Sequence, residues 1–211
     1  MSSHVRPVLV KLAVLSLSFV AAAAAGCGSE DGAAAYFGTT IGATWNYAVT
    51  PASGSGYTET TQNTSGSSST LLRTSTLSNG TPSTTSFALD SDGISITGGT
   101  SMTSQYAYAP PCLLLPSNTT PGFSTSSTST ETGQGYTTQT VAVAITIDGI
   151  ETVVVPAGTF SALKVTRLFS EPTVSYNVKW YASGVGCVKA VNENDLQAVQ
   201  TTWELTSYNI P

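Results

Sequence analysis

Histidine and charge are both scarce in this 211-residue chain: His4 is its one histidine, and charged side chains make up 9% of the residues. His4 falls in the N-terminal segment that we expect to be removed. The processed chain then lacks the imidazole that Ser-His-Asp and Cys-His catalysis and histidine-ligated metal sites require. We therefore expect a protein that is not an enzyme and has no cofactor and no metal site.

Basic residues are scarcer than acidic ones, with 7 Lys and Arg against 12 Asp and Glu. Removal of residues 1–26 takes away Arg6 and Lys11, which leaves 5 basic against 12 acidic side chains and a formal charge of −7. The remaining basic residues form no cluster that could follow a phosphate backbone. We therefore expect no nucleic-acid partner.

Long apolar runs are also missing. The segment Leu12–Ala25 is shorter than the roughly 20 apolar residues that span a bilayer. It follows the charged residues Arg6 and Lys11 and ends in Ala24–Cys27, which is the order of an export signal. This end resembles the lipobox of bacterial lipoproteins, although Ala24 stands where that pattern prefers leucine.

The lipobox resemblance implies cleavage before Cys27 and attachment of acyl chains, such as palmitate, to this cysteine, so that the membrane is a partner through the lipid anchor. The next two residues lack the aspartate signal that retains lipoproteins in the inner membrane, which favours the outer membrane. The domains expected are a signal peptide (1–26), a tether (27–35) and one β domain (36–211). Cleavage by an ordinary signal peptidase, giving a soluble secreted protein, is the alternative.

Segments rich in Val, Ile, Thr and aromatic residues alternate with turn signals from Tyr36 onward, and no segment keeps a helical period. We expect strands at Trp45–Val49 and at Val174–Tyr181. Val141–Ile147 is expected to reverse at Asp148-Gly149 into Ile150–Val155 as a hairpin. Further turns are expected at Ser78–Gly80, Asp92-Gly93 and Val155–Gly158. The Ser/Thr-rich stretches Ser53–Thr70 and Pro116–Thr140 are expected to be long hairpin tips or mobile loops.

These patterns predict an all-β fold: a curved antiparallel meander sheet of ten or so strands, half-barrel-like, with a two-sheet β-sandwich as the alternative. The concave face of such a sheet could hold a hydrophobic ligand. Its expected lining is Trp45, Tyr47, Val178 and Trp180.

Two cysteines follow Cys27. In an oxidising compartment Cys112 and Cys187 are expected to form a disulfide, and two separate buried thiols are the alternative. The pair Lys164 and Arg167 is expected to point to opposite faces of one strand, so that one of them either contacts an anionic ligand inside the curve of the sheet or pairs with a carboxylate.

Three features that suggest catalytic or metal-binding chemistry have simpler structural explanations. Ser161 and Lys164 match a Ser-x-x-Lys motif, but they lie in a predicted strand, where residues three apart point to opposite faces. Asp90–Gly93 starts like a calcium loop but lacks the later glutamate, and a turn explains it. Carboxylates such as Glu151 lie in or beside turns, where solvation is the rule.

The segments Val155–Phe160 and Trp180–Lys189 resemble a set of uncharacterised bacterial envelope lipoproteins with a VPAGTF / WYA-GVG-VK pattern, and Gly42–Tyr47 is similar to the opening strand of that set. The resemblance implies an antiparallel sheet like that of LolA/LolB-type lipoprotein carriers. It implies no activity. We expect a non-catalytic, lipid-anchored envelope protein that binds a hydrophobic ligand or lipid, or alternatively a structural module that binds another envelope protein.

Overall fold

The computed structural model describes residues 32–78, 80–101, 104–134, 137–171 and 173–211. Within these ranges the chain forms one short helix followed by twelve antiparallel strands. The elements are α1 (Ala33–Phe37), β1 (Thr44–Pro51), β2 (Tyr57–Gly66), β3 (Thr70–Leu77), β4 (Ser83–Asp90), β5 (Gly93–Ser101), β6 (Ser104–Pro116), β7 (Ser124–Gly133), β8 (Gln139–Val155), β9 (Gly158–Glu171), β10 (Ser175–Ala182), β11 (Gly186–Asn194) and β12 (Val199–Asn209).

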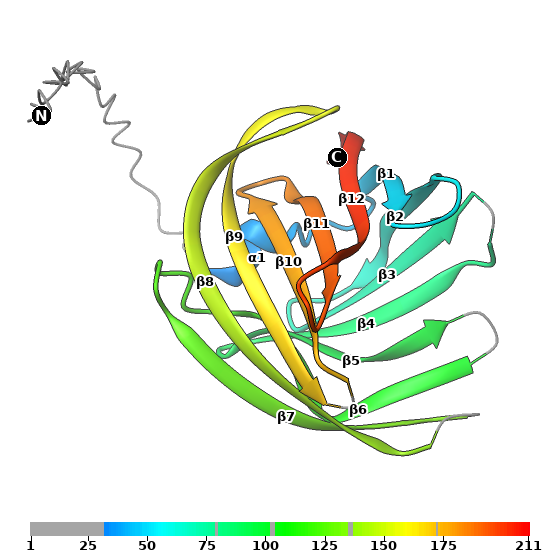
Figure 1. The fold of residues 1–211 in the computed structure, drawn as a ribbon. Coiled ribbons are helices and arrows are strands. Elements are labelled where there is room, and N and C mark those ends of the chain that lie inside the picture. The colour runs from blue at the N-terminus through cyan, green and yellow to red at the C-terminus, as the bar shows by residue number, and fades with distance from the viewer. Residues whose placement is uncertain (1–31, 79, 102–103, 135–136, 172) are drawn as a thin grey trace, which may run out of the picture.

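Each strand pairs with its neighbour in sequence, and β12 returns to pair with β1, so that the sheet closes into a barrel (Figure 1). The all-β antiparallel class is confirmed. The half-barrel and the two-sheet sandwich are wrong, because the pairing of Thr44–Pro51 with Thr201–Asn209 leaves no free edge between the first and last strands.

The Ser/Thr-rich stretches are the largest error in the expected element order. Both contain regular strands, β2 and β7, which pair on both sides. Threonine suits a pleated strand because of its branched Cβ. β8 pairs with β7 from Ser124 to Glu131, and β6 pairs with it over Thr130–Gly133. Low hydrophobicity predicts loops in these two stretches. The interior of this barrel is partly polar, however, so its strands do not all need an apolar face.

The expected hairpin at Asp148-Gly149 is also wrong. The chain continues through these residues as one 17-residue strand, β8, with a register shift between Ile147 and Gly149. Gly149 has φ 140°, a conformation that only glycine adopts readily, so the Asp-Gly pair marks a β-bulge. The reversal comes at the expected Val155–Gly158 turn, and the turn at Asp92-Gly93 is confirmed as well.

Helix α1 lies inside the ring of strands and contacts β5 and β6 on one side and β10 and β11 on the other (Figure 1). Its three alanines favour a helix, and Gly38 ends it in the left-handed region at φ 71°. Ala33 and Phe37 are buried in the core. Helix α1 therefore lies partly within residues 27–35, the range expected for the tether. Residues 1–31, including Cys27, lie outside the described residues.

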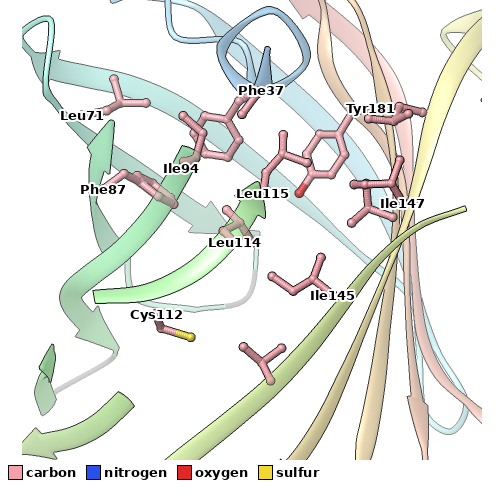
Figure 2. Close-up of a cluster of buried hydrophobic side chains, with 14 of the residues drawn as sticks. Phe37, Leu71, Phe87, Ile94, Cys112, Leu114, Leu115, Ile145, Ile147 and Tyr181 are labelled. Atoms are coloured by element: carbon pink, nitrogen blue, oxygen red, sulfur yellow. The ribbon is translucent and has the colours of Figure 1, made fainter. Parts of the chain in front are cut away.

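The largest apolar cluster fills one part of the barrel interior between α1, β3–β6 and β8–β10 (Figure 2). Phe37 meets Phe87 edge to face at 5.0 Å between ring centroids. Leu115, Ile145 and Ile147 are fully buried beside them. A second cluster joins the tip of the long β8–β9 hairpin to the β1, β11 and β12 strands through Val153, Val155, Trp45, Val188 and Leu205. No described helix is long and apolar enough to cross a bilayer.

Candidate functional site

The space that these two clusters leave inside the barrel is a cavity of about 300 Å³. Its walls come from α1 and from strands on both sides of the ring. The apolar part of the lining is mostly aromatic, with Phe37, Tyr47, Phe87, Ile96, Leu114 and Trp203. A volume of this size lies at the lower end of the range that small-molecule sites occupy.

Three basic side chains line the same cavity: Arg73 from β3, Arg167 from β9 and Lys179 from β10. One carboxylate, Glu59, lines it with them, and it accepts a 2.8 Å hydrogen bond from Trp203 Nε1. In the described part of the chain, no ion pair links any of the three bases to a carboxylate. The cavity is therefore electropositive inside a protein whose total charge is negative.

Arg73 is held by the protein itself. Its Nε donates to Asn63 Oδ1 at 2.9 Å, and its Nη2 donates to the carbonyl oxygens of Phe37 and Gly38 at 3.4 and 3.1 Å. The guanidinium also lies over the rings of Phe37 and Trp45, 4.4 and 4.8 Å from their centroids. Arg73 thus fastens the end of α1 to the barrel wall.

Arg167 is only partly satisfied, although it is 5% exposed. Its Nη2 donates to the carbonyl oxygen of Leu113 at 3.1 Å and contacts Cys112 Sγ at 3.8 Å, while its Nε has no partner. Burial lowers the pKa of Arg167 from its usual value, but an arginine remains charged under all ordinary conditions.

Among the described residues, Lys179 has no hydrogen-bond partner and no ion-pair partner. The residues directly opposite it on the adjacent strands are Val165 and Ala190, which offer no polar group. Burial is the main reason that the pKa of Lys179 is lowered, and the positive charges of Arg167 and Arg73 lower it further. An ammonium group in this position is poorly solvated and lacks a counterion.

A second opening, of about 480 Å³, lies at the end of the barrel where the β9–β10 and β11–β12 connections meet. It shares Arg167, Asn177, Lys179 and Asn192 with the interior cavity. These four polar residues therefore stand where the interior meets the mouth, and the aromatic walls lie further inside.

Two of the four residues expected to face a ligand do point inward. Tyr47 lines the cavity and donates from its hydroxyl to the carbonyl oxygen of Cys187 at 2.7 Å, and burial raises the pKa of this phenol. Trp45 is 1% exposed and donates from Nε1 to the carbonyl oxygen of Val185. Trp45 is thus part of the packed wall beside Arg73.

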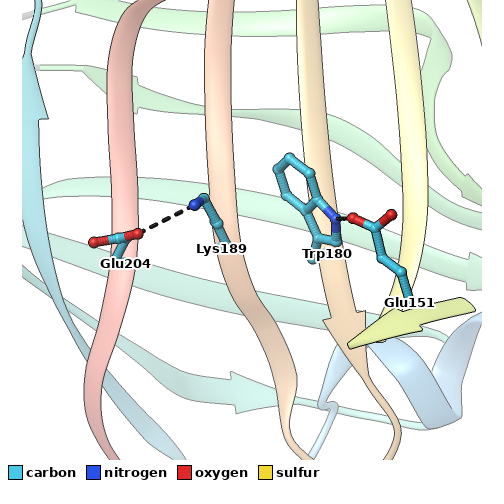
Figure 3. A network of polar contacts seen from close by, with 4 residues as sticks. All are labelled: Glu151, Trp180, Lys189 and Glu204. Atoms are coloured by element: carbon cyan, nitrogen blue, oxygen red, sulfur yellow. Dashed lines mark hydrogen bonds and ion pairs between the residues drawn. The ribbon is translucent and has the colours of Figure 1, made fainter. Parts of the chain in front are cut away.

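Val178 and Trp180 are corrections, because they lie on the other face of β10 from Lys179. Trp180 is on the outside of the barrel, where its Nε1 donates to Glu151 Oε1 (Figure 3). The alternation in the sequence placed the apolar members of β10 inside, but here the polar members, Asn177 and Lys179, face the cavity. An apolar residue outside and a lysine inside is the reverse of the usual pattern.

The predicted disulfide is also corrected, since Cys112 and Cys187 are both free thiols in the structure. They lie on β6 and β11, which are not adjacent strands. Cys112 is buried against Arg167, and the Cys187 thiol donates to the carbonyl oxygen of Lys189 at 3.3 Å. Burial raises the pKa of both thiols, so they act as small core residues.

The pair on β9 behaves as expected. Arg167 enters the barrel, while Lys164 stays outside with its Nζ 5.6 Å from the Trp180 ring centroid. The interpretation of Asp90–Gly93 as a turn is confirmed, because Asp90 Oδ1 accepts hydrogen bonds from the backbone NH groups of Asp92 and Gly93. No metal-ligating cluster of His, Cys, Asp or Glu exists among the residues that the structure covers.

The comparisons with known proteins are consistent with this fold. A model of the DUF3108-like family matches residues 113–205, which run from β6 to β12 and include two of the three segments that carry the sequence resemblance. The chain is similar to that family over this stretch; the specific sequence pattern and the likeness to LolA/LolB-type carriers stay predictions. A search of curated proteins gives no match.

Two solved structures share the fold. One is a candidate exported protein with a YmcC-like fold from Bacteroides fragilis, with a TM-score of 0.56 and 16% identity over 82% of this chain and 98% of that chain. The other is a candidate lipoprotein from Parabacteroides distasonis, with a TM-score of 0.51 and 12% identity over the same shares. At these identities the likeness establishes the fold alone.

Proposed function

We propose that this protein is a lipid-anchored protein of the bacterial cell envelope, at the outer membrane, that binds a small molecule inside its barrel without transforming it. The anchor would be Cys27, at the end of the export signal. Similarity of fold to a candidate lipoprotein and to a candidate exported protein supports the envelope. The lack of histidine after His4 supports a binding role over a catalytic one.

The observation that carries the binding role is the cavity. Large apolar side chains fill much of the interior, yet about 300 Å³ is left between Phe37, Phe87 and Trp203. Buried polar groups converge on that space. An apolar pocket with a few convergent polar groups is the usual form of a small-molecule site. A module that only bound other proteins through its outer surface would have no need of it.

Native mass spectrometry tests the binding role. The chain carrying Cys27→Ser, which removes any acyl anchor, is purified from the envelope fraction, and we expect a bound small molecule of one defined mass. Ala190→Phe should abolish the adduct, because Ala190 lines the cavity beside Lys179 and the added ring fills it. Ala144→Phe is the matched control, since Ala144 is exposed on β8. Recovery of empty protein in every preparation would contradict the proposal.

The anchor is tested separately. Metabolic labelling with a radioactive fatty acid should mark the native chain and leave Cys27→Ser unlabelled. Labelling of neither chain would leave the binding role intact and replace the anchor with the alternative of a soluble secreted protein.

A further inference from the structure

We propose that the molecule bound in the cavity is an anionic amphiphile: a small compound with an apolar body and one carboxylate, phosphate or sulfonate group, whose anion lies between Lys179 and Arg167. This inference rests on the proposed binding function and names the chemistry of the ligand. The apolar body would lie against the aromatic walls deeper in the barrel, at Phe37 and Phe87.

The backbone register places the two cations next to each other. Lys179 is opposite Val165 on β9, and Asn177 is opposite Arg167, so Lys179 and Arg167 are diagonal neighbours on the same face of adjacent strands. Long side chains in this relation can reach a common point. Both side chains line the interior cavity and also the opening at the end of the barrel. An anion can therefore reach the position between them directly from solvent.

Both cations have capacity left for an anion. Lys179 makes no hydrogen bond, and its ammonium carries three donors. Arg167 keeps an unpartnered Nε even though it is 5% exposed. Arg167 is buried and Lys179 is partly buried. A charge without a partner is costly in such a position, and an entering anion would relieve this cost.

Arg73 differs from these two and helps to locate the anion. Its Nε and Nη2 already donate to Asn63 and to two backbone carbonyls. It therefore adds positive potential from the inner end of the cavity without offering the free donors of Lys179. The single carboxylate in the lining, Glu59, is bonded to Trp203, and a cationic ligand would meet three positive side chains against this one negative group.

A pair of fluorescent probes separates charge from shape. Anilinonaphthalene sulfonate and N-phenylnaphthylamine share the same aromatic body, and the first adds a sulfonate. We expect the Cys27→Ser chain to bind one sulfonate probe per molecule, at least tenfold more tightly than the neutral probe. Ala190→Phe should abolish binding of both probes, which places them in the cavity.

The decisive variant is Lys179→Gln, with Lys164→Gln as its matched control on the outside of the barrel. Lys179→Gln should weaken binding of the sulfonate probe by roughly tenfold or more, since removal of one partner of a buried charge pair has a large effect. It should change binding of the neutral probe by less than about twofold, because that probe carries no charge for Lys179 to attract. Lys179→Arg should retain most of the affinity, and Lys164→Gln should change neither probe.

The outcomes distinguish this inference from the proposed function. Equal affinity for both probes, sensitive to Ala190→Phe, would overturn the anionic ligand and leave the binding function in place. Displacement of the sulfonate probe by inorganic phosphate, without displacement by decanoate, would show that the site takes a bare anion and would overturn the amphiphile. Failure to bind either probe inside the barrel would contradict both proposals.

Discussion

The two faces of strands β9, β10 and β11 treat their charges in opposite ways. On the outer face, Lys189 pairs with Glu204 at 3.1 Å, and Trp180 donates to Glu151 (Figure 3). On the inner face, neither Lys179 nor the Nε of Arg167 has a partner in the described ranges, although water is less available there. The charged side chains of Lys189, Glu204 and Glu151 on the outer face have partners within the protein. Lys179 and the Nε of Arg167 on the inner face have none among the described residues.

This contrast indicates which side of the sheet is functional. A fold selected only for stability would place Lys179 outside and fill its position with an apolar residue, because buried charges without partners destabilise the native state. Val165 and Ala190, the residues directly opposite Lys179 on the adjacent strands, are apolar, as is usual inside a protein. A lysine kept among them is the kind of local exception that marks a binding site.

Replacement of the two tryptophans should give the largest difference between the faces. Trp45→Ala should lower the free energy of unfolding by about 3–5 kcal/mol, because Trp45 is 1% exposed and supports both Arg73 and the second apolar cluster. Trp180→Ala should lower it by about 1–2 kcal/mol, since this ring is partly solvated. Urea denaturation of both variants measures the difference. Equal losses would show that the outer tryptophan is as much a part of the core as the inner one.

Arg73→Ala should give the next largest effect. It leaves Asn63 Oδ1 and the carbonyl oxygen of Phe37 without the donors of Arg73 and frees the end of α1, so the free energy of unfolding should fall by about 3 kcal/mol. Hydrogen exchange should show faster opening of residues 33–37 in the variant. Slow exchange there, with unchanged stability, would mean that α1 is held by Phe37 alone.

Lys179→Met should act in the opposite direction and stabilise the ligand-free protein at neutral pH, by about 1–2 kcal/mol, since it replaces a poorly solvated charge with an apolar chain of similar length. The same variant should lose affinity for the sulfonate probe. Lys164→Met, outside the barrel, should change stability by less than about 0.5 kcal/mol.

The stability gained by Lys179→Met should also depend on pH. Because burial lowers the folded-state pKa of Lys179 below its unfolded value, the unfolded chain binds more protons between the two pKa values, and native stability rises with pH across that window. The advantage of Lys179→Met should therefore shrink as pH rises toward 10.5, the ordinary lysine value. Cys187, Arg167, Arg73 and Glu59 face Lys179 and are present in both chains. An advantage that is independent of pH would show that the pKa of Lys179 is the same in the folded and unfolded chains.

The sequence predicted the strands well where one face is apolar. Trp45–Val49 and Val141–Ile147 alternate clearly, and both lie in the expected strands. It failed in the Ser/Thr-rich stretches, where β2 and β7 place threonine and serine on both faces and pairing with the neighbouring strands decides the structure. It failed at Asp148-Gly149 because a bulge and a turn use the same residues.

The candidate site was less predictable than the fold. Lys164 and Arg167 were expected on opposite faces, and the entry of one of them into the barrel was foreseen as a contact for an anion. The alternation Asn177-Val178-Lys179-Trp180 does not show which face of the strand is inside. Hydrophobicity alone predicts that the face with Val178 and Trp180 is inside. Arg73 was missed altogether, since closure of the barrel brings β3 close to the end of α1. The signal that could have indicated the site was the placement of Lys179 and Arg167 at diagonal positions of two adjacent strands.

The smallest effect is expected on the outer face, at the Lys189–Glu204 pair. The side chains of these residues are 28% and 37% exposed, so solvent and salt screen their attraction. A double-mutant cycle with Lys189→Ala and Glu204→Ala should give a coupling free energy below about 1 kcal/mol that falls further in 1 M salt. Binding of the sulfonate probe should be the same in all four proteins of the cycle. A change in that affinity would mean that the outer charges reach the cavity through the sheet, and the separation of the two faces would then be incomplete.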